Sequence, residues 1–378
     1  MRRCVKCVMP STRPDIGFRH DGTCSACDAH EHRVEKDWSA LRQQFLDIIA
    51  ERRTHSVYDC LVASSGGKDS HAIALTMREW GLRPLVFTVT PDFPTPLGRK
   101  NLENLRRLGF DYVEFTPDVR VRRKLNRLCL LEVGDIEWPE HALIFSSPVA
   151  FARDMGIGAV VFGENPQNDI SGGDADAIYL TKAWREEYGG LLGLRPRDLI
   201  GREGITEKDM AAYEWPEERW IWGPDHDSDD EDNPEALFLG QFVPWDGWGN
   251  AELAKRHGFT TYDKPVEGNL WDFENLDNAI IGIHYLLAWV KFGFIRAEVV
   301  ASFYIRHGRR TREEALAACR PIAGWYTDSY LGVPLAEILS DIGLTQEQFD
   351  ETVDRFANTR LMERISPGRW KLKEEYAL

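Results

Sequence analysis

Two spacings of apolar residues alternate along the chain and predict alternating helices and strands. Residues 38–53 repeat apolar side chains every three or four positions, which is the spacing of an amphipathic helix. A short apolar run at 58–64 predicts a strand, and a second helical stretch follows from about Asp69 to Trp80. Further strands are predicted at 84–90, 111–117 and 159–165, with helical stretches between them. Because strands that alternate with helices form parallel sheets, we expect an α/β fold with a doubly wound parallel sheet.

The pattern becomes mainly helical towards the C-terminus, from residue 274 to residue 378. Thr311 with Glu314, and Thr345 with Gln348, have the spacing of capping boxes and mark two helix starts. We therefore predict three parts: a cysteine-rich segment at 1–36, an α/β domain at 37–270 and a helical C-terminal region at 271–378.

The sequence is least regular between 166 and 260. Its acidic run DHDSDDEDNPE, at 225–235, contains no Lys or Arg and predicts a solvated loop. A cation site is the weaker alternative, because the run lacks the glycine and glutamate spacing of an EF-hand. Residues 236–245 predict one more strand.

Composition narrows the classes of function. A chain of 378 residues with 43% apolar content can bury a full core. Its formal net charge of −15 argues against the basic surface that nucleic acid requires, so a small-molecule substrate is favoured. The first residues lack the apolar segment of a signal peptide, and no apolar run approaches the roughly 20 residues of a membrane span. We expect a soluble cytoplasmic protein without a membrane partner.

The cysteines fall into two groups. Four of them form the pattern C-x2-C-x16-C-x2-C, which is the spacing of a zinc ribbon: Cys4, Cys7, Cys24 and Cys27. Four thiolates would close the coordination shell, so we predict a structural zinc ion. Two disulfides are the alternative, disfavoured because cytosolic thiols stay reduced. Cys60, Cys129 and Cys319 are isolated in apolar or helical surroundings, and we expect them to be small buried side chains.

The predicted strand at 58–64 runs into the sequence SSGGKDS, at residues 64–70. It is not a Walker A loop, because Val62 stands at the first glycine position and Asp69 replaces the hydroxyl residue after Lys68. Nor does it provide the three glycines of a dinucleotide fingerprint. Glycines between a strand and a helix nevertheless let backbone N–H groups approach phosphate oxygens.

This stretch resembles the PP-loop of the ATP pyrophosphatases. The resemblance implies that the loop grips ATP as pyrophosphate and that AMP is transferred to a carbonyl or amide oxygen. Lys68 would offset the charge on pyrophosphate and Asp69 would hold Mg²⁺. The ATP-binding residues so implied are Ala63, Ser64, Ser65, Gly66, Gly67, Lys68, Asp69, Ser70, Thr90 and Gly163.

Three stretches together resemble the N-acetyl sugar amidotransferases. They are the N-terminal cysteine segment with CVMPSTRP and DGTCSAC, the SSGGKDS loop, and KFGFIRAEVVASFYIRHGRRTREEA at 291–315. The family converts the acetamido group of an anionic or nucleotide-linked amino sugar into an acetamidino group, with release of AMP and pyrophosphate, in bacterial surface glycan biosynthesis. The resemblance therefore implies an AMP-forming ligase that uses ATP, Mg²⁺ and structural Zn²⁺.

Further site residues follow from position and charge. Glu164 and Asn165 end the strand at 159–165. Glu164 would steer ammonia or take its proton, and Asn165 would bind substrate. For Glu164 the alternative is a strand-end carboxylate held in an ion pair. Asp92 would place magnesium or ribose, with a plain turn aspartate as the alternative. Four cations of the distal segment either form surface ion pairs with Glu298 and Glu313 or bind the anionic sugar, and the family resemblance favours sugar binding: Lys291, Arg296, Arg306 and Arg309.

The chain offers no cysteine suited to a glutaminase, since two of the candidates belong to the metal pattern and the others lack flanking glycines. Ammonia would then come from solution or from a partner. The family resemblance implies a glutaminase subunit, together with a cyclase-like subunit, similar to those of imidazole glycerol phosphate synthase.

Two other classes remain open on the sequence alone. A PP-loop sulfurtransferase that modifies tRNA is one, although Cys129 and Cys319 do not form the expected pair and the charge opposes tRNA. A zinc-ribbon interaction module with an inactive nucleotide fold is the other, and the intact loop argues against it.

Overall fold

The structure is a computed structural model that describes residues 1–168, 174–216, 233–324 and 326–378. Within these residues a five-stranded parallel sheet has the order β3-β2-β1-β4-β5. The strands are β1 (Cys60–Ser64), β2 (Pro84–Val89), β3 (Asp111–Phe115), β4 (Ala159–Phe162) and β5 (Glu235–Phe238). The predicted parallel sheet is therefore confirmed. The acidic run at 225–235 lies outside the described residues except for its last three positions.

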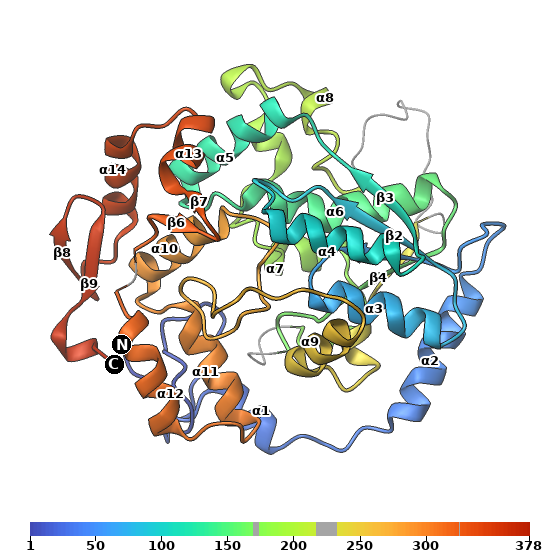
Figure 1. The fold of residues 1–378 in the computed structure, drawn as a ribbon, viewed down its shortest axis with the longest axis horizontal. Helices are drawn as coiled ribbons and strands as arrows, with labels where there is room; N and C mark the ends of the chain where they lie inside the picture. The colour runs from blue at the N-terminus through green and yellow to red at the C-terminus, as the bar shows by residue number, and fades with distance from the viewer. Residues whose placement is uncertain (169–173, 217–232, 325) are drawn as a thin grey trace.

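Helices cover both faces of the sheet. Successive apolar residues of a strand point to opposite faces, so each face needs helices to bury its apolar side chains. Val62 packs with Phe45 and Ile73, which come from α2 (Trp38–Glu51) and α3 (Lys68–Glu79). Its neighbour Leu61 packs on the other face with Leu125 of α5 (Val119–Val133) and Trp138 of α6 (Trp138–Asp154). The sheet is thus doubly wound, as predicted (Figure 1). Other helices are α1 (Ser25–Glu31), α4 (Pro96–Arg107), α7 (Lys182–Tyr188), α8 (Glu207–Met210) and α9 (Gly247–Arg256).

The C-terminal region is helical only in part. Its helices are α10 (Ile281–Phe292), α11 (Arg296–Arg306), α12 (Arg312–Cys319), α13 (Leu335–Asp341) and α14 (Gln346–Phe356). Both predicted capping boxes are present, at the starts of α12 and α14. The prediction of helix is wrong for the two strand pairs β6 (Ser329–Tyr330) with β7 (Val333–Pro334) and β8 (Met362–Ser366) with β9 (Arg369–Leu372). Pro367 and Gly368 separate β8 from β9, and the glycine has a φ of +69°, which favours a hairpin over a helix.

The predicted strand at 236–245 is also shorter than expected. Pairing with β4 ends at Phe238, and a 3₁₀ turn follows at Leu239–Gln241. The Gly240 N–H donates to the Gly163 carbonyl, so the chain turns across the end of β4 and does not extend the sheet.

The two ends of the chain lie side by side (Figure 1). Arg3 donates from Nη1 to the Tyr376 carbonyl at 2.8 Å, and Thr12 donates to the Phe292 carbonyl. The N-terminal cysteine segment therefore packs on the C-terminal region, while α2 lies beside the sheet. Among the described residues, no helix has the length and apolar content needed to span a membrane.

Candidate functional site

The SSGGKDS loop lies at the carboxyl end of β1, the central strand of the sheet. β1 ends at Ser64 and α3 begins at Lys68, with Gly67 as its N-cap residue. Gly66 has a φ of +81°, and a Cβ atom placed there would lie 2.5 Å from Leu102 Cδ2. Only glycine fits both the conformation and the space, so the loop follows a path that its glycines impose.

Three serine hydroxyls hold the loop in shape by accepting backbone N–H groups. Ser64 Oγ accepts from Gly66 at 3.1 Å, and Ser65 Oγ accepts from Gly67 at 3.4 Å. Ser70 Oγ, in the first turn of α3, accepts from the Ser65 N–H at 3.0 Å. Ser70 is buried whereas Ser65 is exposed. The loop is therefore closed on its inner side and open to solvent at Ser65, next to the positive end of α3.

Lys68 and Asp69 form the charged pair of the site. Lys68 is 7% exposed, and its Nζ lies 2.5 Å from Asp69 Oδ2. The other Asp69 oxygen accepts a hydrogen bond of 2.8 Å from Asn250 Nδ2 of α9. Burial opposes the charge on Lys68, but the carboxylates of Asp69, Glu274 and Glu164 outweigh it and raise the lysine pKa. Lys68 therefore stays protonated, and its positive charge can bind a phosphate group.

Glu274 is a buried member of this site that the sequence analysis missed. Arg296 donates to both of its oxygens, from Nε at 2.9 Å and from Nη2, and Asn269 Nδ2 donates at 2.7 Å. Although burial acts against the carboxylate, these groups and Lys68 lower its pKa to about 2. Glu274 lies in the irregular stretch WDFEN, with no periodicity or motif that would have singled it out.

Glu164 and Asn165 follow β4, next to β1 in the sheet. This is the point at which the strand order reverses and where ligands of such sheets bind. Glu164 is exposed and acts electrostatically on Lys68. Its role towards ammonia and the acceptor amide stays a prediction. Asn165 is buried, and its amide donates to the Asp174 carbonyl at 2.7 Å, which ties down the segment after β4. Gly163 packs against the ring of Trp245.

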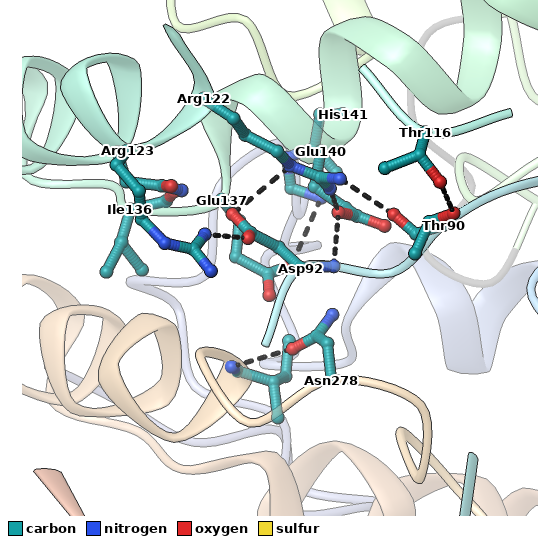
Figure 2. Close-up of polar contacts among 12 residues, drawn as sticks. Thr90, Asp92, Thr116, Arg122, Arg123, Ile136, Glu137, Glu140, His141 and Asn278 are labelled. Carbon is teal, nitrogen blue, oxygen red and sulfur yellow. Dashed lines mark hydrogen bonds and ion pairs between the residues drawn. The ribbon is translucent and has the colours of Figure 1, made fainter. Parts of the chain in front are cut away.

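Thr90 and Asp92 follow β2 and enter a buried ion cluster. Figure 2 shows Asp92 between Arg122 and Arg123; the Arg122 Nε to Asp92 Oδ2 distance is 3.2 Å. Arg122 also pairs with Glu140 and donates to the Thr90 carbonyl at 2.7 Å. With Asp92 only 2% exposed, its carboxylate holds α5 against the end of β2. This position differs from the plain turn aspartate that was the alternative expectation.

The distal cations do not share one location. Arg296 reaches the loop region through Glu274. Lys291 donates to the carbonyls of Val133 and Gly134, at 3.1 and 2.7 Å, and so caps the C-terminus of α5; burial lowers its pKa. Arg306, at the end of α11, lies beside His30 of the cysteine segment. The structure thus brings only Arg296 of these three to Lys68.

Arg309 forms an ion pair with Asp246, which caps the N-terminus of α9; the Nη2 to Oδ2 distance is 2.6 Å. Glu298, the partner expected for these cations, instead pairs with Arg3 at 3.1 Å.

The four N-terminal cysteines form a candidate metal centre. Their Sγ atoms lie within 4.8 Å of one another, all four residues are buried, and the Cys7 and Cys24 sulfurs are 3.7 Å apart. A tetrahedral zinc ion with Zn–S bonds of about 2.3 Å places its sulfurs about 3.8 Å apart, so the donor set fits zinc. Backbone N–H groups donate to Cys7 Sγ and Cys4 Sγ, and a hydrogen bond with Cys24 lowers the pKa of both thiols. None of the seven cysteines forms a disulfide, so these four can hold a metal such as zinc.

The isolated cysteines are buried, as expected. Cys60, Cys129 and Cys319 have 0% exposure, and burial raises the pKa of each thiol, to about 12 for Cys319. A buried thiol with a raised pKa is a poor nucleophile, so none of the three is suited to carry sulfur.

A large cavity of about 1240 Å³ lies elsewhere, on the α6 face of the sheet. Apolar residues of β2, β3, α6 and α8 line much of it: Phe87, Phe115, Phe151 and Met210. No residue of the SSGGKDS loop lines this cavity, so the size of a cavity does not identify the site here.

Comparison with protein families matches residues 257–375 to the family described as "LPS biosynthesis protein WbpG-like, C-terminal domain". No curated protein matches this chain significantly. The matched segment contains Glu274 and Arg296, and so includes part of the site around Lys68. The match supports the expectation of a protein of lipopolysaccharide or related glycan biosynthesis.

Proposed function

We propose that the protein is an ATP-dependent amidotransferase that converts the N-acetyl group of an amino sugar into an acetamidino group. The observation that carries the proposal is the SSGGKDS loop between β1 and α3, with buried Lys68 paired to Asp69 at the carboxyl end of the sheet. The candidate metal centre and the family match at 257–375 add support, because both agree with the resemblance to the N-acetyl sugar amidotransferases.

The chemistry requires activation of a poor leaving group. In the first step the amide oxygen of the sugar attacks the α-phosphorus of ATP and pyrophosphate leaves. In the second, ammonia adds to the amide carbon, and that oxygen departs as part of AMP. Lys68 would hold the β- and γ-phosphates, and the Asp69 carboxylate would hold Mg²⁺. The positive charge of Mg²⁺ would stabilise the departing pyrophosphate.

The proposed substrate is an anionic or nucleotide-linked amino sugar. Ser65 and Gly67 would contact phosphate, while Gly163, Glu164 and Asn165 border the place where the acceptor amide would lie. Arg296 is the distal cation that supports this substrate best, since its partner Glu274 also acts on Lys68. Lys291 and Arg306 occupy structural positions, which makes them weaker candidates for sugar binding.

We further propose that ammonia comes from a separate glutaminase subunit in the cytoplasm. The described structure leaves all seven cysteines buried, four of them in the metal cluster. A glutaminase needs an accessible, activated cysteine, which none of these residues provides.

The test is a reaction of purified protein with ATP, Mg²⁺, ammonium at alkaline pH and an N-acetylated amino sugar acid. Expected products are AMP, pyrophosphate and a sugar whose neutral mass is lower by about one unit, because an oxygen is replaced by an NH group. The product should also carry a new positive charge, because an amidine is protonated near neutrality as a guanidinium is. Glutamine should replace ammonium only when a glutaminase is added. Release of ADP and phosphate would contradict the proposal, and sulfur transfer to tRNA would assign the chain to the other PP-loop class.

A further inference from the structure

A pair of titratable groups, buried Asp135 and half-buried His284, lies at the carboxyl edge of the sheet, outside the loop. His284, in the first turn of α10, donates from Nδ1 to Asp135 Oδ1 at 2.9 Å. The Glu137 N–H donates to the same Asp135 oxygen at 3.0 Å, which fixes the carboxylate in the turn between α5 and α6. Asp135 is 6% exposed, so its position is set by packing. The pair therefore holds the imidazole in one orientation and one tautomer.

The other ring nitrogen of His284 is available. With Nδ1 bonded to a carboxylate, a neutral imidazole carries its proton on Nδ1 and leaves the Nε2 lone pair to accept one. Within the described part of the chain, no residue hydrogen-bonds to Nε2, and 32% of the His284 side chain is exposed. A purely structural ion pair has no need for a partly exposed ring with an unused nitrogen.

The pair lies near the proposed ATP site. The segment that leads into α10 is joined to the chain after β2, because Ala279 N donates to the Phe93 carbonyl at 3.0 Å. α6 leads into β4, so the N-terminus of this helix, with Glu137 before it, lies at the same carboxyl edge. Figure 2 shows Glu137 near Asp92, which follows β2. Asp277 links the two places, because it interacts electrostatically both with Lys68 and with Glu137.

Four titratable groups surround His284. Asp135 and Glu137 come from the α5–α6 turn, His141 from α6, and Lys291 from its own helix. Burial acts against the imidazolium, but Asp135 and Glu137 outweigh burial and Lys291 and raise the pKa of His284 to about 9. His141 behaves differently, since burial lowers its pKa to about 4 and keeps it neutral.

We propose that His284, held by Asp135, is the general base of the amination step. The inference rests on the proposed function and adds a catalytic residue to it. When ammonia adds to the adenylated amide carbon, its nitrogen becomes positively charged. His284 Nε2 accepts one proton from that nitrogen, the bond from carbon to the AMP oxygen breaks, and AMP leaves with that electron pair. The amidine remains, and the proton passes from His284 to water.

The first experiment separates the two half-reactions with the variant His284→Asn. Asparagine can keep a side-chain N–H towards Asp135 but has no counterpart of Nε2. We expect sugar-dependent exchange of labelled pyrophosphate into ATP to stay near the wild-type rate, because it reports adenylation alone. Amidine formation should fall on the order of 10²-fold or more, the usual contribution of a positioned base. His55→Asn, a change at an exposed histidine, is the matched control and should leave both rates unchanged.

The second experiment reads the pH dependence with hydroxylamine in place of ammonia. Hydroxylamine is unprotonated throughout the alkaline range, so its own titration does not enter the profile. The rate should rise with pH through about 9, as the His284 imidazolium loses its proton. Asp135→Asn removes the carboxylate that raises this pKa, so the midpoint should move below the alkaline range and the variant's rate should stay flat across it. A merely structural pair would not move the midpoint.

Two results would overturn the inference. One is equal loss of exchange and amidine formation in a folded His284→Asn protein, which would make the pair structural. The other is an unchanged midpoint in Asp135→Asn. If the wild-type protein forms no amidine but retains ATP exchange with another acceptor, the proposed function fails instead, so the two failures are distinguishable.

Discussion

Lys68 shows how a single side chain depends on its neighbours in this protein. It is buried beside Asp69, and two more carboxylates, Glu274 and Glu164, act on it from other parts of the chain. An isolated buried ammonium would lose its charge, whereas this one keeps it. The residue type at Gly66 is also set by a neighbour, because Leu102 of α4 fills the space that a side chain at this position would need.

Gly66→Ala should destabilise the protein more than Gly81→Ala, which is the matched control. Both glycines have φ near +80°, so each alanine costs about 1 kcal/mol in backbone strain. Gly81 has open space around it, but a Cβ at Gly66 would overlap Leu102, which adds about 1–3 kcal/mol. Urea unfolding measures the free energy of unfolding of both variants. Equal losses of this free energy would show that the Leu102 side chain moves to make room for the new methyl group.

Lys68→Ala and Asp69→Ala should each lower ATP turnover on the order of 10²-fold, since each removes a charge that would stabilise departing pyrophosphate or its Mg²⁺. Lys100→Ala, at an exposed position of α4, is the control and should keep full activity. The measurement is AMP release in the presence of sugar. Wild-type turnover in a folded Lys68→Ala protein would remove this lysine from the site.

At the scale of elements, α11 is tied by the ion pair of Arg296 with Glu274 to the stretch before α10, and Glu274 acts electrostatically on Lys68 of the loop. α10 is tied to the α5–α6 turn by His284 with Asp135, and to the end of α5 by Lys291. The two contacts of α10 join the segment matched to the WbpG-like domain to the α/β sheet domain, whereas Arg296 and Glu274 both lie within the matched segment. The contacts of α10 therefore help to fix how the two parts meet.

Arg296→Met should lower the free energy of unfolding by about 3 kcal/mol near neutral pH, because it leaves Glu274 buried without its guanidinium. The pKa of Glu274 is about 2 in the folded protein and ordinarily 4.5. The contribution of the pair is therefore present above pH 4.5 and is lost as the pH falls towards 2. Unfolding of both proteins across this range should show the difference narrowing. Arg106→Met breaks an exposed pair with Glu103 and should change little.

At the scale of the whole molecule, the cysteine cluster and the C-terminal region form one body. The four cysteines share an apolar cluster with Val299 of α11, with Phe294 and Ile305 packed against it. Arg312 of α12 donates from Nε to the Cys7 carbonyl at 2.9 Å. A metal held by the cysteines would therefore stabilise both ends of the chain together.

Cys24→Ser should lose about one zinc ion per chain and expose the C-terminal helices as well as the cysteine segment to protease, since four-thiolate sites contribute directly to folding. Metal analysis and limited proteolysis measure the two effects. Cys319→Ala, at a cysteine outside the cluster, should retain the metal. A metal-free Cys24→Ser protein with wild-type protease resistance would contradict a structural role.

Much of the α/β domain was predictable from the sequence, because its signals are local. Apolar spacing gave α2, α3 and the first four strands within a few residues, and the glycines of the loop marked the turn between β1 and α3. The spacing of Cys4, Cys7, Cys24 and Cys27 predicted their cluster, since each close pair needs only one turn of chain. The division at 1–36, 37–270 and 271–378 stays a prediction.

Other features depended on contacts between distant segments, which no local pattern records. Glu274 joins the site because α11 brings Arg296 to it, and Asp92 is buried because α5 places two arginines around it. Lys291 was expected to bind substrate because of its charge and the family resemblance, whereas in the structure its Nζ donates to the carbonyls at the end of α5. The sequence by itself determined the sheet, the loop and the cluster of four cysteines that could hold a metal. The tertiary structure alone decided which charges surround Lys68 and His284, because burial and pairing of a charge depend on what packs against it.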